Sequence, residues 1–304
     1  MKKVLLYLVL AVSLNSFAGS DPYFRQMENL LRMYNPSYAG LQDFGQRSFL
    51  LNVRNQWMDF QQGKPMSVSA VFGGYYEKLK GAVDGSYMYD QLGIYKNHWI
   101  SLKYAYSAKL GEESNLNLGL RTTLGLINAD FGSCPTNIPN YICEFEGRHK
   151  GVIPDFDAGL MYNWGTKLFV SLSARHLTQP SAKIKSLQGN EFDLGKQYLT
   201  YYALAGSDFN IGEHGSFIAA LDYRYSGNTG QGNVRADARW RFIYGGFYCV
   251  LDDWNNYVSP YGFTLGFSKK EGKLHLLSSF EPSTVDGFGS TLEAGMKYVF
   301  GKKD

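Results

Sequence analysis

The sequence predicts an all-β protein, a transmembrane antiparallel up-and-down β-barrel of about fourteen strands with a short N-terminal plug or periplasmic segment. The clearest strand spans residues 115–127, where five leucines alternate with polar residues or glycine: Leu116, Leu118, Leu120, Leu124 and Leu126. Successive side chains of a strand point to opposite faces, so this strand has one apolar and one polar face. Aromatic residues make up 16% of the 304 residues, and after the first 18 no apolar run approaches the ~20 residues of a membrane helix.

The first eighteen residues have the features of a secretory signal peptide. Lys2 and Lys3 precede an apolar run from Val4 to Leu14, and small residues follow at Ser16 and Ala18. We expect residues 1–18 to be removed by cleavage after Ala18, with a cut after Ser20 as the alternative. No cysteine stands near either site, so a lipoprotein anchor is not indicated.

Residues 19–45 do not alternate as a strand does. A short helical run from Met27 to Met33 is followed by two chain-breaking pairs, Asn35-Pro36 and Ala39-Gly40. We expect this segment to be either a periplasmic lead-in or a small plug in the barrel mouth. The remaining residues, 46–304, contain no linker and are expected to form one barrel domain.

The alternating pattern recurs fourteen times after this segment. The expected strands are 46–57, 66–72, 81–89, 99–110, 115–127, 154–164, 167–176, 197–208, 216–225, 233–242, 246–251, 261–268, 274–281 and 291–300. In the first of them Phe49, Leu51, Val53 and Trp57 share the outward face, and Phe49 and Trp57 suit the two aromatic girdles of a membrane barrel.

The connections between these strands alternate between long and short. Long connections at 128–153, 177–196, 226–232, 252–257 and 282–289 are expected to be extracellular. Short ones at 111–114, 165–166, 211–215, 243–245 and 269–273 are expected to be periplasmic turns. An even strand number returns the chain to the side on which it began.

The last predicted strand resembles the C-terminal sorting strand of bacterial outer-membrane barrels. Glu293 and Gly295 precede the aromatic pair Tyr298 and Phe300, and four residues follow Phe300. Together with the signal peptide, this resemblance indicates a Gram-negative outer membrane. Outer-membrane lipid and the barrel-assembly machinery are therefore expected partners.

Several short blocks resemble the PorP/SprF family of outer-membrane proteins associated with type IX secretion in Bacteroidetes. They are Asp21-Pro22-Tyr23-Phe24, Asn35-Pro36-Ser37-Tyr38-Ala39-Gly40, Arg54-Asn55-Gln56-Trp57, Pro154-Asp155-Phe156-Asp157-Ala158-Gly159-Leu160 and Arg175-His176-Leu177-Thr178-Gln179-Pro180. Two positions depart from the commoner family form, which has Gly where Asp157 stands in this sequence and His or Asn where Arg175 stands. The resemblance implies a barrel that works with the type IX translocon in secretion or surface attachment of large adhesins, some used in gliding motility.

Charged residues recur on the inward faces of the expected strands. Asp155 and Asp157 lie roughly 7 Å apart on one face, which permits acid–base chemistry but favours pairing with lumen arginines. The expected lumen charges are Arg54, Arg121, Asp157, Asp222, Arg224, Arg235, Asp237, Arg239, Arg241 and Glu293. Paired charge of this kind suits a closed or plugged barrel, with a solute-selective lumen as the alternative.

The sequence offers little support for an enzyme, a metal site or a cofactor. The five histidines are scattered, without metal-ligand spacing. His176 is in phase with the lipid-facing Leu168, Val170 and Leu172, which permits a barrel hydrolase, but a hydrogen bond from its ring to the following turn is the favoured interpretation. A net charge of +3 gives no basic patch for nucleic acid.

The three cysteines fall into two groups. Cys134 and Cys143 lie nine residues apart in the longest connection of an exported protein, so we expect a disulfide between them. Cys249 is in phase with Phe247 and Leu251 and is expected to be a packing residue.

The leading functional hypothesis is a partner-binding barrel of type IX secretion that assists export or surface attachment of a secreted adhesin. A channel for small or apolar solutes is the alternative, and a barrel hydrolase is the least supported reading.

Overall fold

The computed structural model describes residues 21–39, 46–60, 63–132, 144–165, 167–227, 229–251, 260–269 and 273–300. The expected signal peptide, Gly40 and the pair Cys134 and Cys143 lie outside these ranges. Within them, no helix has both the length and the apolar character needed to cross a membrane.

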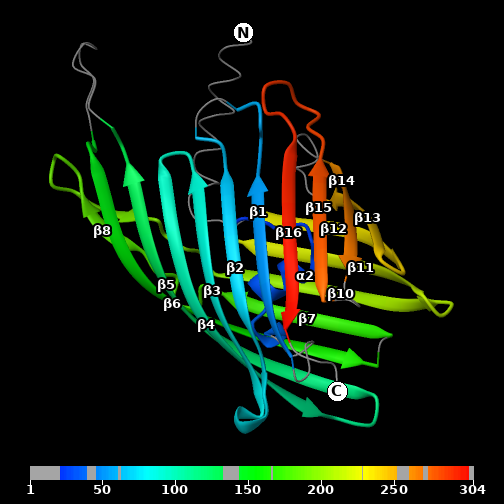
Figure 1. Cartoon of the computed structure of the whole chain (residues 1–304). Coiled ribbons are helices and arrows are strands. Elements are labelled where there is room, and N and C mark those ends of the chain that lie inside the picture. The colour runs from blue at the N-terminus through cyan, green and yellow to red at the C-terminus, as the bar shows by residue number, and fades with distance from the viewer. Residues whose placement is uncertain are drawn as a thin grey trace.

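Fourteen antiparallel strands of the described chain close into a barrel, as the alternation predicts (Figure 1). The barrel strands are β1 (Arg47–Asn55), β2 (Met66–Tyr76), β3 (Gly81–Leu92), β4 (Tyr95–Lys109), β5 (Ser114–Asp130), β6 (Arg148–Trp164), β7 (Leu168–Arg175), β10 (Thr200–Ile211), β11 (Gly215–Ser226), β12 (Thr229–Trp240), β13 (Ile243–Leu251), β14 (Tyr261–Lys269), β15 (Leu274–Glu281) and β16 (Thr291–Phe300). Each pairs with the barrel strands before and after it in the chain, and β16 closes the barrel against β1, with Arg47 opposite Phe300 and Arg54 opposite Glu293.

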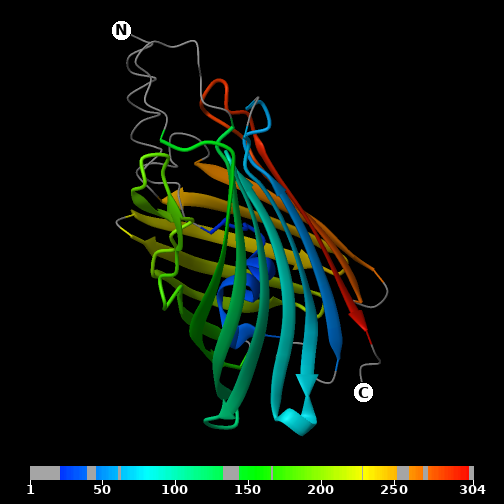
Figure 2. The same ribbon diagram turned by 90° about the vertical axis from the view of Figure 1, so that its left-hand side faces the viewer.

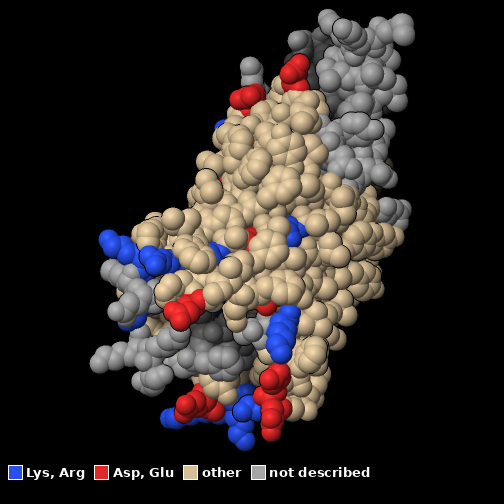
Figure 3. Space-filling model, turned by 90° about the vertical axis from the view of Figure 1, so that its right-hand side faces the viewer, with Lys and Arg blue, Asp and Glu red and all other residues tan. Residues whose placement is uncertain are grey.

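The two faces of the wall differ in the way that a membrane barrel requires. On β5, Leu118, Leu120 and Leu124 point outward and are exposed, whereas the inward Arg121 and Thr123 are buried. Figure 3 shows one side of the outer wall, where few charged side chains interrupt a broad uncharged surface. An apolar exterior around a polar interior is the pattern of a barrel whose outer face contacts lipid.

Several strand ends differ from the sequence-based expectation. β5 and β6 run farther, to Asp130 and from Arg148, because the two strands pair with each other beyond the apolar region. β1 ends at Asn55, so Trp57 lies in the connection after the strand and not within it. Trp57 has a positive φ of 53° and packs on Phe60 and Phe288 in the adjoining connections.

The long connection between β7 and β10 contains a hairpin that alternation misses. Its strands are β8 (Ala182–Lys185) and β9 (Glu191–Leu194), and they pair only with each other within the described chain. Leu194 of this hairpin is buried in the same apolar cluster as Ile127 of β5 and Ile153 of β6. The hairpin therefore packs against the long-connection end of the barrel instead of extending freely.

Candidate functional site

Residues 21–39 lie inside the barrel, which is the plug position of the two positions expected for this segment (Figures 1 and 2). They form helix α2 (Met27–Tyr34) and the 3-10 helix η1 (Pro36–Tyr38). All of these residues are buried except Met27, Glu28 and Tyr38, which are half-buried. We call residues 21–39 the plug.

The plug crosses the barrel from the long-connection end to the short-turn end. Asp21 lies beside Arg175 and His176, where β7 enters the longest described connection. Ala39 packs with Ala82 at the start of β3 and Ala105 near the end of β4. The plug, the nineteen residues from 21 to 39, therefore has contacts at both ends of the barrel.

The wall supplies the caps of helix α2. Its N-cap residue, Gln26, has no side-chain capping hydrogen bond. Instead the carboxylate of Glu293, on β16, accepts hydrogen bonds from the backbone N–H groups of Arg25 at 2.8 Å and Gln26 at 3.2 Å. An anion at this end is stabilised by the helix dipole and satisfies donors that have no partner within the helix.

The carbonyl groups at the other end of α2 are satisfied in the same way. Lys103 of β4 donates to the carbonyl oxygen of Arg32, and Arg121 of β5 donates to that of Met33. Ser173 Oγ of β7 donates to the carbonyl oxygen of Tyr34 at 2.9 Å. Two cations therefore lie where the helix dipole favours positive charge, and three strands hold the last turn.

A buried four-membered charge cluster joins the start of the plug to the barrel seam. Arg25 Nε contacts Glu281 at 2.6 Å, and Arg54 bonds both Glu281, at 2.9 Å, and Glu293, at 3.1 Å. Tyr248 donates a further hydrogen bond to Glu281 at 2.8 Å. Two arginines balance two glutamates, which is the condition under which buried charges are tolerated.

Arg32 makes the corresponding contact on the opposite side of α2. Its guanidinium bonds both carboxylate oxygens of Asp84 at 3.0 Å, and it donates to Ser48 Oγ at 2.6 Å. A bidentate arginine–carboxylate pair fixes orientation as well as charge. The plug is thereby held to β1 and β3.

The Asn35-Pro36-Ser37 block forms the turn after α2. Asn35 Oδ1 accepts from the backbone N–H of Ser37 at 2.9 Å, and Asn35 Nδ2 donates to Ser171 Oγ at 2.6 Å. The turn lies directly on Gly119 of β5 and Gly159 of β6. A side chain at Gly159 would place its Cβ 2.0 Å from Asn35 Oδ1, so both glycines permit this close approach.

His176 has a position that strand phase does not predict. Its backbone φ is +56°, which turns the side chain away from the lipid face and into the lumen, where it is buried. Nδ1 bonds Asp155, and Nε2 lies 3.1 Å from Asp21 Oδ2. The expected hydrogen bond from the ring to the following turn is replaced by contacts to two carboxylates.

Asp155, Asp157 and His176 are close enough to hold a cation. However, Arg121 and Arg175 both contact Asp157, and Arg175 also contacts Asp21. With His176 protonated, three cationic groups balance three carboxylates. The donors therefore do not favour a divalent metal, because an added ion would leave buried positive charge unbalanced.

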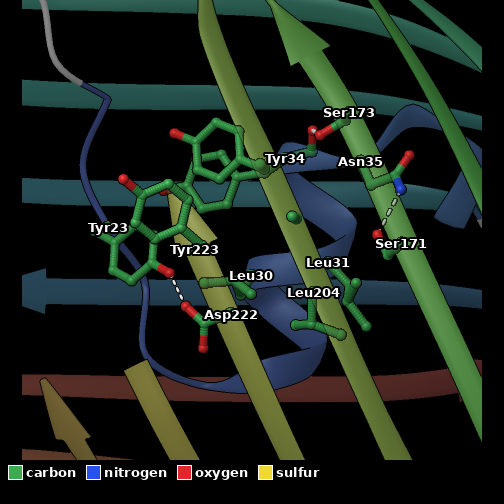
Figure 4. A pocket seen from close by; sticks show the side chains of 12 residues that line it. Tyr23, Leu30, Leu31, Tyr34, Asn35, Ser171, Ser173, Leu204, Asp222 and Tyr223 are labelled. Atoms are coloured by element: carbon green, nitrogen blue, oxygen red, sulfur yellow. Dashed lines mark hydrogen bonds between the residues drawn. The ribbon is translucent and has the colours of Figure 1, made fainter. Parts of the chain in front are cut away.

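Tyr23 and Tyr34 of the plug stack with Tyr202 of β10 in the lumen, and Figure 4 shows the two plug tyrosines. Tyr34 stacks on Tyr202 with ring centroids 4.6 Å apart, and Tyr23 stacks on Tyr34 at 6.1 Å. Tyr23 also donates a hydrogen bond to Asp222. The cavity left among these side chains has a volume of about 10 Å³, which is close to the space of one water molecule.

The other expected lumen charges are distributed along β11 and β12. Arg235 pairs with Asp222 at 3.3 Å, Arg224 donates to the carbonyl oxygen of Asp21 at 2.9 Å, and Asp237 is buried. Arg239 is exposed at the end of β12. Arg241 does not belong to the strand, because it lies in the turn after β12 with a positive φ of 53°.

The remaining motif residues lie near the long-connection end or within strands β6 and β16. Gln56 N–H donates to the carbonyl oxygen of Pro65, and Asn55 ends β1. Gln179 has a φ of +45°, and the carbonyl oxygen of Pro180 accepts from Gln197 N–H. Pro154 lies within β6, and Gly295, Tyr298 and Phe300 lie within β16.

Sequence reasoning missed six charged groups of this site: Asp21, Arg25, Arg32, Asp84, Lys103 and Glu281. Asp84, Lys103 and Glu281 occupy inward positions of their strands, so strict alternation would have found them. The three plug residues follow no periodic pattern.

Fold and site together define an outer-membrane β-barrel whose lumen contains part of its own N-terminal segment, residues 21–39. Among solved structures, CymD, a monoaromatic hydrocarbon channel, is similar in fold, with a TM-score of 0.55, 11% identity and coverage of 93% of this chain and 95% of its own. The P. putida toluene transporter TodX is similar with a TM-score of 0.55 and 8% sequence identity, and the match covers 94% of this chain and 96% of TodX. The Ralstonia pickettii toluene transporter TbuX is similar with a TM-score of 0.53 and 9% sequence identity, and the match covers 89% of this chain and 92% of TbuX.

The sequence model of one protein family matches residues 16–291 of this chain, and that family is described as type IX secretion system membrane protein PorP/SprF. The chain belongs to this family and is an outer-membrane component of type IX secretion. Comparison with curated proteins gave no match.

Proposed function

We propose that this protein is a docking component of type IX secretion, which binds a secreted adhesin or another secretion component at its long-connection end. The observation that supports this proposal best is the plug. Its buried ion pairs and helix caps come from strands around the barrel, and the cavity beside it has room for about one water molecule. A barrel closed in this way acts through its surface.

The hairpin of β8 and β9 is the surface we assign to partner binding. Its base is anchored by the buried Leu194, while Leu187 at its tip is 62% exposed. Lys183 and Lys185 are also exposed on β8. Loops on a rigid scaffold are the usual carriers of recognition. The alternative, a channel for small or apolar solutes, is favoured by the fold of CymD and TodX, but it requires the plug to move.

Export through the signal peptide and insertion by the barrel-assembly machinery complete this proposal. A pull-down from detergent extracts, analysed by mass spectrometry, tests it. The double variant Lys185→Glu, Leu187→Asp should fold normally on a heat-modifiability gel and lose co-purifying type IX components or adhesin by at least tenfold. Leu110→Asp is the matched control, because Leu110 is an exposed leucine in a short turn.

If the hairpin variant retains every partner and secretes normally, recognition does not reside in the hairpin. Conduction of an apolar solute by the purified wild-type protein would favour the channel function instead.

A further inference from the structure

A groove of about 470 Å³ interrupts the lipid-facing wall over β1, β2 and β3. Its walls are the outward side chains of Phe49, Phe72, Tyr76, Val83 and Tyr87, and Gly85 lies among them. A Cβ added to Gly85 would meet only the carbonyl oxygen of Phe72, at 4.0 Å. The groove exists because this outward position carries no side chain.

The groove extends over part of one leaflet of a bilayer. Tyr87 pairs with Ala70, and Ala70 pairs with Leu51, so one end of the groove is in register with Leu51 on β1. Arg47 lies four residues earlier on the same strand, toward the short-turn end. Four residues rise about 13 Å along a strand, and because the strands of membrane barrels are tilted by about 35–45°, this span covers about 10 Å of the ~30 Å hydrocarbon core.

A cation with no acidic partner among the described residues lies at the short-turn end of the groove. The Arg47 guanidinium is 5.5 Å from the centre of the Tyr76 ring, and no carboxylate of the described chain forms a salt bridge with it. Lys78 and Lys80 are exposed in the turn after β2, together with Glu77. Arginine is well suited to a phosphate because its planar donors can bond two oxygens.

We propose that this groove binds one glycerophospholipid, with an acyl chain over Gly85 and the phosphate at Arg47. A lipid fits both halves of the site, since the apolar part faces the hydrocarbon region and the charged part lies at its boundary. An arginine at the groove end, with no acidic partner in the described part of the chain, has no such role in a purely apolar protein contact.

The test measures lipid retention on the purified full-length protein by native mass spectrometry. The probes are phosphatidylglycerol and a diacylglycerol with the same acyl chains but no phosphate. The wild-type protein should bind one phosphatidylglycerol at least tenfold more tightly than diacylglycerol. Gly85→Leu should weaken binding of both lipids about tenfold, and Arg47→Gln should remove the preference for phosphate.

Two matched controls separate this site from general lipid contact. Gly245→Leu fills an open position on β13, where an added Cβ meets nothing within 4 Å. Lys167→Gln removes a cation that lies 5.8 Å from the Trp164 ring, away from the groove. Both control variants should bind lipid as the wild type does.

If Gly85→Leu does not fold, Gly85→Ala should still fold and show an intermediate loss. Equal retention by the Gly85 variants and the wild type would overturn the proposal. Equal loss in Gly245→Leu, or co-purification of a protein that protects the groove in place of lipid, would also overturn it.

Discussion

The imidazole of His176 connects the plug to the wall through two carboxylates. Asp21 belongs to the plug and Asp155 to β6, and the backbone of His176 lies outside the strands. Burial alone would lower the pKa of His176, and so does the nearby Arg175, but Asp21 and Asp155 outweigh both and raise it to about 9. Burial would likewise raise the pKa of Asp21, but Arg175 and His176 hold it well below its usual range.

The raised pKa of His176 predicts a pH dependence of stability. The stabilisation is fully present below the ordinary pKa of 6.5 and is lost as pH rises through about 9. The loss should be on the order of 3 kcal/mol at most, since one pKa unit corresponds to about 1.4 kcal/mol. Thermal unfolding in detergent across this interval measures it. His176→Gln should be less stable at neutral pH and should not show this decline; a parallel decline in both proteins would exclude His176 as its source.

The buried charge cluster around Arg54 predicts a larger loss of stability from a single substitution. Arg54→Met leaves Glu281 and Glu293 with Arg25 as their remaining buried cation, so we expect a loss of about 3–5 kcal/mol in the free energy of unfolding. Adding Glu281→Gln to Arg54→Met should recover part of this loss. Arg239→Met, at an exposed position near the end of β12, should change stability by less than about 1 kcal/mol. Equal effects of Arg54→Met and Arg239→Met would contradict the buried cluster.

Helix α2 depends on the wall more than on its own sequence. Eight residues are too few for a stable isolated helix, and its ends are satisfied by Glu293, Lys103, Arg121 and Ser173. The eight residues from Met27 to Tyr34 therefore form a helix because the barrel presents an anion at one end and two cations at the other.

The turn after α2 predicts which substitution loosens the plug. Gly159→Val should displace Asn35, because an added Cβ would lie 2.0 Å from Asn35 Oδ1 and 2.9 Å from Pro36 Cδ. We expect a folded barrel whose plug is cleaved faster by protease, as peptide mapping would show. Gly245→Val, which meets no atom within 4 Å, should behave as the wild type. Unchanged protection of the plug in Gly159→Val would mean that this contact does not hold it.

The barrel strands could be predicted from the sequence because one face of each contacts lipid and the other faces the lumen. Leu118, Leu120 and Leu124 carry that signal plainly. The sequence could not decide whether the N-terminal segment is a plug or a periplasmic lead-in, because Asp21, Arg25 and Arg32 are buried among charges and show no apolar periodicity. The β8–β9 hairpin was missed because only Leu194 and a few neighbours pack inward, and His176 was placed outward because phase does not reveal a positive φ.

At the scale of the whole molecule, the plug and the wall form one unit. The plug runs from Asp21 near the long connections to Ala39 near the short turns, and it pairs with strands on opposite sides of the barrel. The expected orientation places the hairpin of β8 and β9 outside the cell. A closed interior and a structured outer surface are what a docking component requires.

Electrical recording in planar lipid bilayers tests the central claim, that the plug closes the barrel, most directly. The purified wild-type protein should show no stepwise conductance, whereas Gly159→Val should show openings because its plug is displaced, and Gly245→Val should remain silent. Stable conductance by the wild-type protein, equal in size to that of Gly159→Val, would contradict the claim and favour a channel.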